Sequence, residues 1–273
     1  MLKGYLVFNM KKVYIFITIM FILFITSSCS KTTIINEVIN REVIYGENIS
    51  ILDFEDAIVE ASNIASKTVV AIKTETKTAI MTNNSFASGV VISKTKINDN
   101  LYSYYVITNK HVVATNSGNL RTVYISFSEG DTYSASVCKL DDTKDIAIIS
   151  FECPRILEVA RVATKKTEVG RFVIAVGNPY DVDKYYSTIT VGNVSYVDRI
   201  IIDKIDDNKE VRNLYIQHNA EINHGNSGGG LFNIKGELLG INTWKIANED
   251  IEGMGFAIPI DSISEDLLEY FQK

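Results

Sequence analysis

Residues 225–229 read GNSGG, a serine enclosed by glycines, and residues 231–243, LFNIKGELLGINT, follow after Gly230. Glycines around a serine allow a tight turn, leave the hydroxyl exposed and present amide N–H groups to a developing oxyanion. The stretch after the turn has the pattern of a β-hairpin that reverses at Lys235-Gly236. This segment predicts Ser227 as a nucleophile in a β-rich fold. The alternative is a glycine-rich turn in which the serine is incidental.

The string also fits G-x-S-x-G, the nucleophile turn of α/β-hydrolases, but two observations argue against a serine esterase of that class. That turn leads into a helix, whereas a hairpin is expected here. The α/β-hydrolase order is Ser, then acid, then His, and all three histidines of this chain, at 111, 218 and 224, precede Ser227.

His111 is the best candidate for a general base because it lies near the end of the stretch YVITNKHVV, where an apolar strand runs into a polar turn. A structural histidine is the alternative reading. His218 and His224 are weaker candidates, since they lie on the segment that must shape the nucleophile turn. The cysteines and histidines show no C-x-x-C or H-x-x-x-H spacing, so we expect no metal site, and the chemistry needs no organic cofactor.

Asp145 opens DIAIISF and so lies directly before a buried strand, where a carboxylate can hold an imidazole. Asp141 and Asp142 are competitors, and turn formation is the alternative role for all three. Taken together, the candidates give the order His111, Asp145, Ser227. This order is that of the chymotrypsin-type β-barrel proteases.

The rest of the chain has the pattern of an all-β protein with a helix at each end. Helical spacing predicts a helix over 53–66, with Asp53 as N-cap, and another over 261–272, with a capping box at Ser262 and Glu265 and an apolar face. Polar stretches at 95–103 and 203–213 are expected to tip long hairpins. Short apolar runs between turns predict the strands of a sandwich or barrel: VVAI, GVVI, YYVIT, VYISF, IAIISF, FVIAVG, STITVGNVSYV, LYIQ, LLGINT and GFAIP.

The first thirty residues predict export from the cytoplasm. Lys11 and Lys12 precede an apolar run at 13–25, and small residues lead into Cys29. We interpret 1–29 as a lipoprotein-type signal peptide with Cys29 as the lipidated residue, and 30–50 as a tether. An uncleaved membrane anchor and a simple secretory signal remain open. The formal net charge of -6 argues against a nucleic-acid partner.

Cys138 and Cys153 are the remaining cysteines, and they flank a predicted hairpin centred near Thr143. In that register Cys138 faces a residue near Ile148 rather than Cys153. Two buried free thiols are therefore expected, and a disulfide is the less favoured alternative.

The chain resembles the HtrA (Deg) family of trypsin-like proteases from about residue 55 to 262. Each matching stretch is weak alone, but together they run in the family's order. They are SGVVIS, VITNKHVV, KDIAIISF, AVGNPY, STITVGNVSYVDR, QHNAEINHGNSGGGLFN, LLGINT and GMGFAIPI.

The resemblance implies two six-stranded β-barrels within a protease domain at 51–273, the first at about 66–155 and the second at about 160–260. His111 and Asp145 come from the first barrel and Ser227 from the second. The resemblance implies an oxyanion hole at residues 225–227, Gly225, Asn226 and Ser227, in which the N–H groups of Gly225 and Ser227 are the donors. It also implies a serine endopeptidase that cuts unfolded polypeptides.

Four departures from the family pattern stand out. His224, Asn219 and Gly230 replace the usual residues of the nucleophile segment, and no room is left for a PDZ domain after residue 261. Ile222 is expected to line an apolar pocket for a small aliphatic P1 residue, while Glu221 leaves a basic P1 residue as an alternative. Two further points stay open: a trimeric homo-oligomer, and a catalytically silent protein that binds polypeptides.

Overall fold

The computed structural model describes residues 51–77, 81–115, 121–128, 130–141, 143–178, 187–206, 209–243 and 253–273. The chain divides into two compact units, residues 1–54 and 55–273, and only residues 51–54 of the first unit are described. The proposed signal peptide, the tether and Cys29 therefore lie outside the described residues. Within the part that the structure describes, no helix is both long and apolar enough to cross a membrane.

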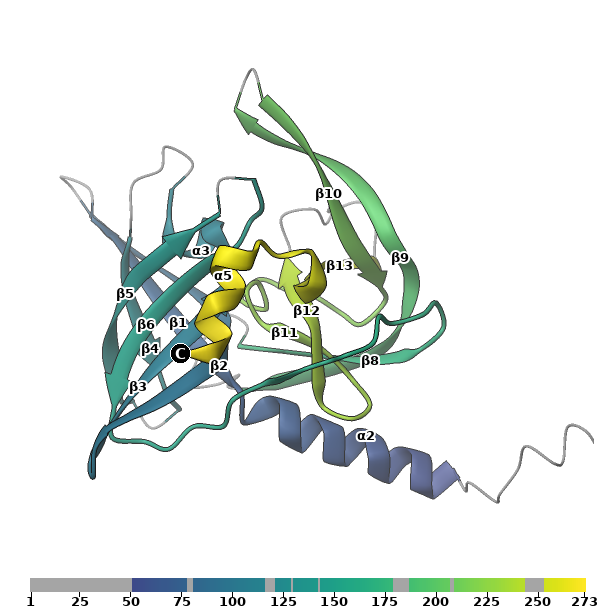
Figure 1. Ribbon diagram of the computed structural model, residues 1–273, viewed down its shortest axis with the longest axis horizontal. Coiled ribbons are helices and arrows are strands. Elements are labelled where there is room, and N and C mark those ends of the chain that lie inside the picture. Colours follow the sequence, from purple (N-terminus) through teal and green to yellow (C-terminus); the bar gives the residue numbers. More distant parts are fainter. Residues whose placement is uncertain are drawn as a thin grey trace, which may run out of the picture. The chain divides into compact units, whose positions relative to one another are not determined.

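Six antiparallel strands close the first barrel in the order β1-β2-β3-β6-β5-β4. Their bounds are β1 Val69–Lys77, β2 Thr82–Asn98, β3 Leu101–Thr108, β4 Thr122–Ser126, β5 Thr132–Leu140 and β6 Ala147–Cys153. The polar segment at 95–103 forms the tip of the β2–β3 hairpin, as predicted (Figure 1). Strand β5 was absent from the sequence-based set because its burial alternates between half-buried and exposed positions, without an apolar run.

A second sheet contains seven strands in the order β11-β8-β9-β10-β13-β12-β7, and an added β11–β12 pairing joins its first strand to its sixth. Six of these strands therefore form a closed ring, and the two-residue strand β7 is added to β12. The two sheets confirm the predicted all-β class and the two-barrel chymotrypsin fold. The bounds are β7 Arg161–Val162, β8 Phe172–Gly177, β9 Thr188–Asp206, β10 Lys209–His218, β11 Gly230–Asn233, β12 Glu237–Thr243 and β13 Gly255–Pro259.

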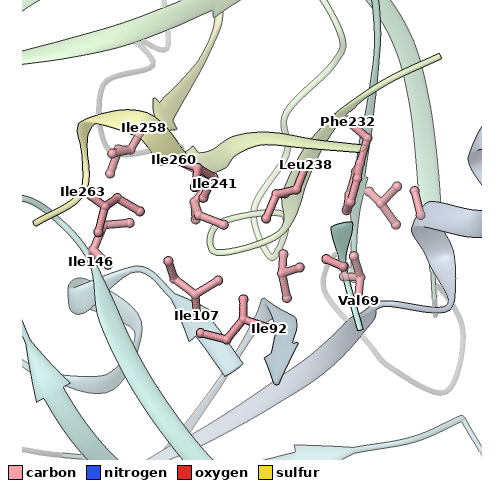
Figure 2. Close-up of a cluster of buried hydrophobic side chains, with 14 of the residues drawn as sticks. Val69, Ile92, Ile107, Ile146, Phe232, Leu238, Ile241, Ile258, Ile260 and Ile263 are labelled. Carbon is pink, nitrogen blue, oxygen red and sulfur yellow. The ribbon is translucent and has the colours of Figure 1, made fainter. Parts of the chain in front are cut away.

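Among the described residues, three buried apolar clusters follow from the alternation of side chains along the strands, because neighbouring residues point to opposite faces of a sheet. One lies inside the first barrel and includes Ile72, Val106 and Ile149. Another belongs to the second sheet and includes Ala175 and Leu231. The third joins the two sheets and is drawn in Figure 2, where its labelled members are Val69, Ile92, Ile107, Ile146, Phe232, Leu238, Ile241, Ile258, Ile260 and Ile263.

Helix α2, Ile51–Ser66, packs against the third cluster through the small residues Ala61 and Ala65. Asp53 lies within its first turn, so the prediction of Asp53 as N-cap is wrong. A carboxylate there still interacts favourably with the positive end of the helix, which is why the residue type misled the prediction. The β11–β12 turn contacts this helix at Gly236, where a Cβ would lie 2.7 Å from Ile64 Cγ2.

The end of the chain is a broken helix rather than the continuous one expected over 261–272. It consists of a 3₁₀ turn, η1 Ile260–Ser262, then α5 Glu265–Leu268 and η2 Glu269–Gln272. The N-cap of α5 is Ser264, and Ser262 Oγ donates instead to the carbonyl of Pro259, so the predicted capping box is wrong. The predicted apolar face is confirmed, because its residues pack into the third cluster: Ile263, Leu267, Leu268 and Phe271.

Both remaining cysteines are free, as predicted, but only Cys153 is buried. Cys138 is exposed, which corrects the expectation of two buried thiols. It falls at a β-bulge, where Val137 pairs with Ile149 and Lys139 pairs with Ile148. Cys138 belongs to the alternating exposed positions of β5, and the bulge breaks the alternation only after it, at Lys139. Its Sγ lies 3.2 Å from Ser150 Oγ.

Candidate active site

His111 lies on α3, Lys110–Val113, a single helical turn that follows β3 directly. Val112 and Val113 are buried in the first barrel's core and anchor this turn. Asn109 is its N-cap, and the Asn109 side chain donates to the backbone carbonyl of Asp145 at 2.9 Å. This bond joins the chain segments that carry His111 and Asp145 independently of the His111 and Asp145 side chains.

Asp145 holds the imidazole through two hydrogen bonds to the same residue. Its Oδ1 accepts from the His111 backbone N–H at 2.9 Å, and its Oδ2 lies 2.6 Å from His111 Nδ1. Thr243 Oγ1, from the second sheet, lies 3.4 Å from the same Oδ2. Side-chain exposure is 11% for Asp145 and 32% for His111. A carboxylate beside Nδ1 keeps the proton on that nitrogen and leaves Nε2 as the basic position.

Ser227 lies between two consecutive turns. Asn226 N–H donates to Asn223 O at 3.0 Å, and Gly229 N–H donates to Asn226 O at 2.9 Å. The third residue of each turn is a glycine with a positive φ, +97° at Gly225 and +82° at Gly228. A positive φ at this position is what a type II turn requires, and it reverses the central peptide relative to a type I turn. The glycines therefore fix the direction of the amides on both sides of the serine.

The Ser227 segment is fastened to the first barrel by Ser88 on β2. Ser88 N–H donates to Ser227 O at 2.9 Å, and Ser88 Oγ donates to Gly225 O at 2.7 Å. The same hydroxyl accepts from Asn178 N–H at 2.7 Å. Ser88 O in turn accepts from Thr108 Oγ1 at 2.7 Å, and Thr108 ends the strand that leads to His111. Two barrels meet at this residue, and they carry the serine and the histidine toward the same place.

Gly228 allows the close approach on which this junction depends. A Cβ on Gly228 would lie 2.1 Å from Ser88 O and 2.2 Å from Thr108 Oγ1. Any side chain here would force the two barrels apart, and the positive φ adds strain for an L-residue. The glycines were expected to leave the Ser227 hydroxyl exposed, but the residue as a whole is only 6% exposed, because the first barrel contacts the turn through Ser88.

The three residues predicted for the oxyanion hole differ in what their amides do. Asn226 N–H is used within the first turn, so Asn226 does not fit the role of a donor. Its part is to shape the turn that orients Gly225. The amides of Gly225 and Ser227 remain the candidates, as the chemistry of an oxyanion hole requires adjacent donors directed at one point.

Ile222 and Glu221, the predicted substrate-binding residues, have different surroundings. Ile222 is half-buried, packs on the second sheet's core and approaches Gly255 on β13. Glu221 is exposed, and its Oε1 accepts from Asn223 Nδ2 at 3.0 Å, so its carboxylate is engaged by its own loop. This geometry favours an apolar pocket wall over an acidic one.

The competing acids and histidines have other surroundings. Asp141 Oδ1 accepts from Thr143 N–H, Thr143 Oγ1 and Lys144 N–H, which is a turn-forming role. Asp142 lies outside the described residues. His224 is exposed in the turn before Ser227, and His218 is fully buried.

Two of the departures from the family pattern have a clear structural setting. Asn219 Oδ1 accepts from Asn193 N–H at 2.7 Å, which ties the nucleophile segment to β9. At Gly230, a Cβ would lie 2.2 Å from Phe232 Cε2, so a larger residue would need this ring to move. Both positions affect how the nucleophile segment is supported rather than which groups react.

Sequence reasoning missed the groups that hold the site together. Ser88 and Thr243 lie within stretches that match the HtrA pattern, SGVVIS and LLGINT, but neither was given a role. Ser88 lies within β2 and Thr243 ends β12, and a lone hydroxyl at such positions is a weak signal, because serine and threonine are common in many settings, turns included. Their partners lie far away in the sequence, 137 residues for Ser88 and Gly225 and 98 residues for Thr243 and Asp145.

Comparison with known proteins places this geometry in a family. A trypsin-like peptidase domain matches residues 87–241, which is more than half of the chain. The serine endoprotease DegS of Haemophilus influenzae is 32% identical over 233 residues, covering 82% of this chain and 62% of that protein. The periplasmic serine endoprotease DegP of Escherichia coli is 35% identical over 190 residues, covering 68% of this chain and 36% of that protein.

A solved structure, the serine endoprotease from Yersinia pestis, is similar with a TM-score of 0.58 and 29% identity, over 79% of this chain and 67% of that one. The chain thus belongs to the trypsin-like peptidase family. Within that family it is of the HtrA type, as its similarity to DegS and DegP shows. It spans less than two thirds of the length of these two curated relatives.

Proposed function

We propose that this protein is a serine endopeptidase in which His111, Asp145 and Ser227 form the catalytic triad. The observation that carries the proposal is the pair of hydrogen bonds that the Asp145 carboxylate accepts from the His111 backbone and ring, at 2.9 and 2.6 Å. An ordinary surface ion pair would involve the ring alone, without the additional bond to the His111 backbone N–H. It is expected where an imidazole must be held in one orientation and one tautomer.

In this mechanism Ser227 Oγ attacks the carbonyl carbon of the scissile peptide bond, and His111 Nε2 takes the hydroxyl proton. His111 then delivers that proton to the leaving amine, which leaves the acyl group as an ester on Ser227. His111 next takes a proton from a water molecule that attacks this ester, and it returns the proton to Ser227 Oγ as the acid product leaves. Asp145 stabilises the imidazolium that forms in each step. The N–H groups of Gly225 and Ser227 stabilise the tetrahedral oxyanion, and one such donor is worth about 10²–10³ in kcat.

The substrates are unfolded or misfolded polypeptides with a small aliphatic P1 residue. Half-buried Ile222 and the bare backbone of Gly255 support an apolar pocket of limited depth, and the Glu221 carboxylate is engaged elsewhere. Cleavage-site mapping on denatured casein tests this preference. Cuts mainly after Lys or Arg would contradict it and would assign the pocket to Glu221.

The protein acts outside the cytoplasm, attached to the membrane by lipid on Cys29. The signal-like pattern of residues 1–29 supports this location, as does the similarity to proteases whose names describe them as periplasmic. The protease domain then covers residues 51–273, after a tether at 30–50. Fractionation of cells that express the wild type and Cys29→Ser tests the anchor. Loss of membrane association is expected only for the variant, and equal distribution of the two proteins would contradict lipidation.

The direct test of the activity compares the purified full chain with Ser227→Ala on unfolded casein and on a fluorophosphonate probe. The wild type is expected to cut casein and to bind the probe covalently, and the variant to do neither while it melts at nearly the same temperature. Cleavage by the variant at the wild-type rate would overturn the assignment of Ser227. A folded wild type that neither cuts nor reacts would instead favour a silent binding protein.

A further inference from the structure

His218 is the last residue of β10 and is fully buried, with 0% exposure. It pairs with Gly255 on β13 and with Val194 on β9, where a register shift marks an irregularity in the β9–β10 ladder. A histidine completely removed from water is uncommon unless its ring nitrogens are hydrogen-bonded. The mechanism proposed above makes no use of this residue.

The His218 ring takes the place of a side chain on Gly255. A Cβ at Gly255 would lie 2.5 Å from His218 Cε1 and 3.0 Å from Ile222 Cγ1. The imidazole therefore packs directly on the β13 backbone, next to the residue proposed to line the P1 pocket. Its size and orientation determine how closely β13 and the segment before Ser227 approach each other.

Buried polar atoms gather at this ring. Among the residues that the structure describes, neither ring nitrogen of His218 has a hydrogen-bond partner at good geometry, and Asn242 Oδ1 is also buried without one. The Asn242 side chain and the Ala220 backbone are nevertheless close enough to favour the protonated ring in part. Asn242 Nδ2 donates to Gly230 O at 2.9 Å, which fixes the amide orientation and leaves Oδ1 as the acceptor. A short adjustment of the ring would therefore satisfy a histidine N–H and this oxygen together.

Asn242 connects this ring to the nucleophile segment. Its backbone carbonyl accepts from Gly228 N–H at 2.9 Å, and its backbone N–H donates to Gly229 O at 2.8 Å. With the side-chain bond to Gly230, three hydrogen bonds from one residue hold the three residues that follow Ser227. A displacement of Asn242 must therefore displace the serine's turn.

We propose that His218 is a positioning residue, which sets the turn around Ser227 by donating an N–H to Asn242 and which supports the P1 wall by packing on Gly255 and Ile222. The kinetic part of this inference rests on the proposed peptidase function, while the hydrogen bond itself does not. His218 acts as a neutral imidazole. Burial lowers the pKa of His218 to about 4, and the Ala220 backbone and Asn242 side chain offset only part of that effect.

No charged side chain stabilises a protonated ring at this place, as far as the described residues go. The groups around it are Gly255 on β13, Val194 on β9, Asn242 on β12, and Ala220 and Ile222 after β10. The nearest acid in the sequence, Glu221, is exposed and bonded to Asn223. The neutral state is therefore the only one that the site favours at physiological pH.

The first test is spectroscopic and does not depend on activity. In the full chain labelled with ¹⁵N-histidine, the His218 ring is expected to stay neutral until about pH 4 and to show a slowly exchanging N–H. That N–H signal should shift in Asn242→Ala and stay in place in Val194→Ala, a core change beside the ring that removes no acceptor. A His218 ring that titrates near pH 6.5 in the folded protein, or an N–H that is unchanged in Asn242→Ala, would overturn the proposal.

The second test is kinetic, on peptide substrates at pH 8. His218→Phe keeps a ring but removes the donor, and it should lower kcat by about tenfold because a buried acceptor loses its partner beside the nucleophile turn. His218→Gln restores a donor and should return kcat to within about threefold of the wild type. Val194→Ala should lower the melting temperature and leave kcat unchanged.

Two kinetic results would overturn the positioning role. One is a folded His218→Phe protein with wild-type kcat. The other is a His218→Gln protein as slow as the Phe variant, since a purely structural role predicts no rescue. An inactive wild type would contradict the peptidase function, and the spectroscopic test would then still decide whether the hydrogen bond exists.

Discussion

His111 and Asp145 belong to one barrel, are 34 residues apart and are joined by direct hydrogen bonds. Ser227, by contrast, belongs to a glycine-rich turn whose anchor, Ser88, lies on the other barrel, 137 residues before Gly225. The acid–base pair is therefore rigid by local construction, and the serine is placed by long-range contacts. Changes to the side chains of His111 or Asp145 should therefore disrupt the acid–base pair. The position of Ser227 should also be sensitive to changes at distant residues such as Ser88.

Removing the charge of Asp145 is expected to have the largest effect, because it disrupts the local pair of His111 and Asp145. Asp145→Asn should lower kcat by about 10⁴, because an amide cannot hold the same tautomer or stabilise the imidazolium. Kinetics on a peptide substrate measure this loss, with thermal melting to confirm folding. Asp141→Asn is the control, and a loss above tenfold for it would move the acid's role to that turn.

Gly228→Ala should have the next largest effect on activity, because it disrupts the long-range contacts between the Ser227 turn and the first barrel. Its Cβ would meet Ser88 O at 2.1 Å, and the backbone φ of +82° is strained for alanine. Because small misplacements of reacting groups are costly, we expect activity to fall by about 10² or more.

Gly130→Ala is the matched control for this change. Gly130 has nearly the same φ, +83°, but a Cβ there meets nothing within 4 Å. It should lose about 1–2 kcal/mol of stability from the backbone strain and keep its activity. Equal activity losses in the two variants would show that strain, rather than the junction, controls the serine.

Ser88→Ala tests the junction without adding atoms. It leaves Gly225 O and Asn178 N–H without the hydroxyl that joins them, at a cost of about 1–3 kcal/mol. Activity should fall by about tenfold, because the turn loses one of its two bonds to β2. Ser126→Ala, another buried serine of the first barrel, is the control for side-chain loss alone. An active, fully stable Ser88→Ala protein would contradict the anchoring role.

The smallest expected effect at neutral pH concerns the free energy of unfolding and not catalysis. The His218 pKa is about 4 in the folded protein and about 6.5 in the unfolded chain, so the unfolded state binds the extra proton between those values. Stability is therefore complete above pH 6.5 and falls by about 3 kcal/mol as the pH drops to 4.

Urea unfolding of Ser227→Ala at several pH values measures this slope, since self-cleavage is then prevented. The double variant with His218→Gln should lose the His218 contribution between pH 6.5 and 4. An unchanged slope in the double variant would assign the acid sensitivity to other groups.

The sequence was sufficient to predict the local structure around His111 and Asp145. The stretch before His111 and the strand after Asp145 are apolar runs with one plausible structure each, and their expected strands were found. Gly225 and Gly228 indicated turns, because glycine adopts the positive φ that such turns require more readily than other residues do.

The long-range side was not predictable in the same way. The burial of Ser227 and its anchoring by Ser88 depend on which strands meet, and the sequence pattern alone does not contain that information. The predicted helix ends were also wrong: Asp53 and Ser262 have the residue types of caps, but α2 begins at Ile51 and the N-cap of α5 is Ser264. Helix ends are the least predictable part of a helix, because several neighbouring residues can serve as caps.

The bond between Ser88 and Gly225 also has a consequence for biosynthesis. The hydrogen bonds between His111 and Asp145 involve residues of the first barrel alone, whereas the turn around Ser227 lacks its bonds to Ser88 until both barrels are in place. Contacts this distant in sequence form late, since the loop they close is long. We therefore expect a newly made chain to lack peptidase activity until both barrels have folded, so that completion of the fold is itself the activation step.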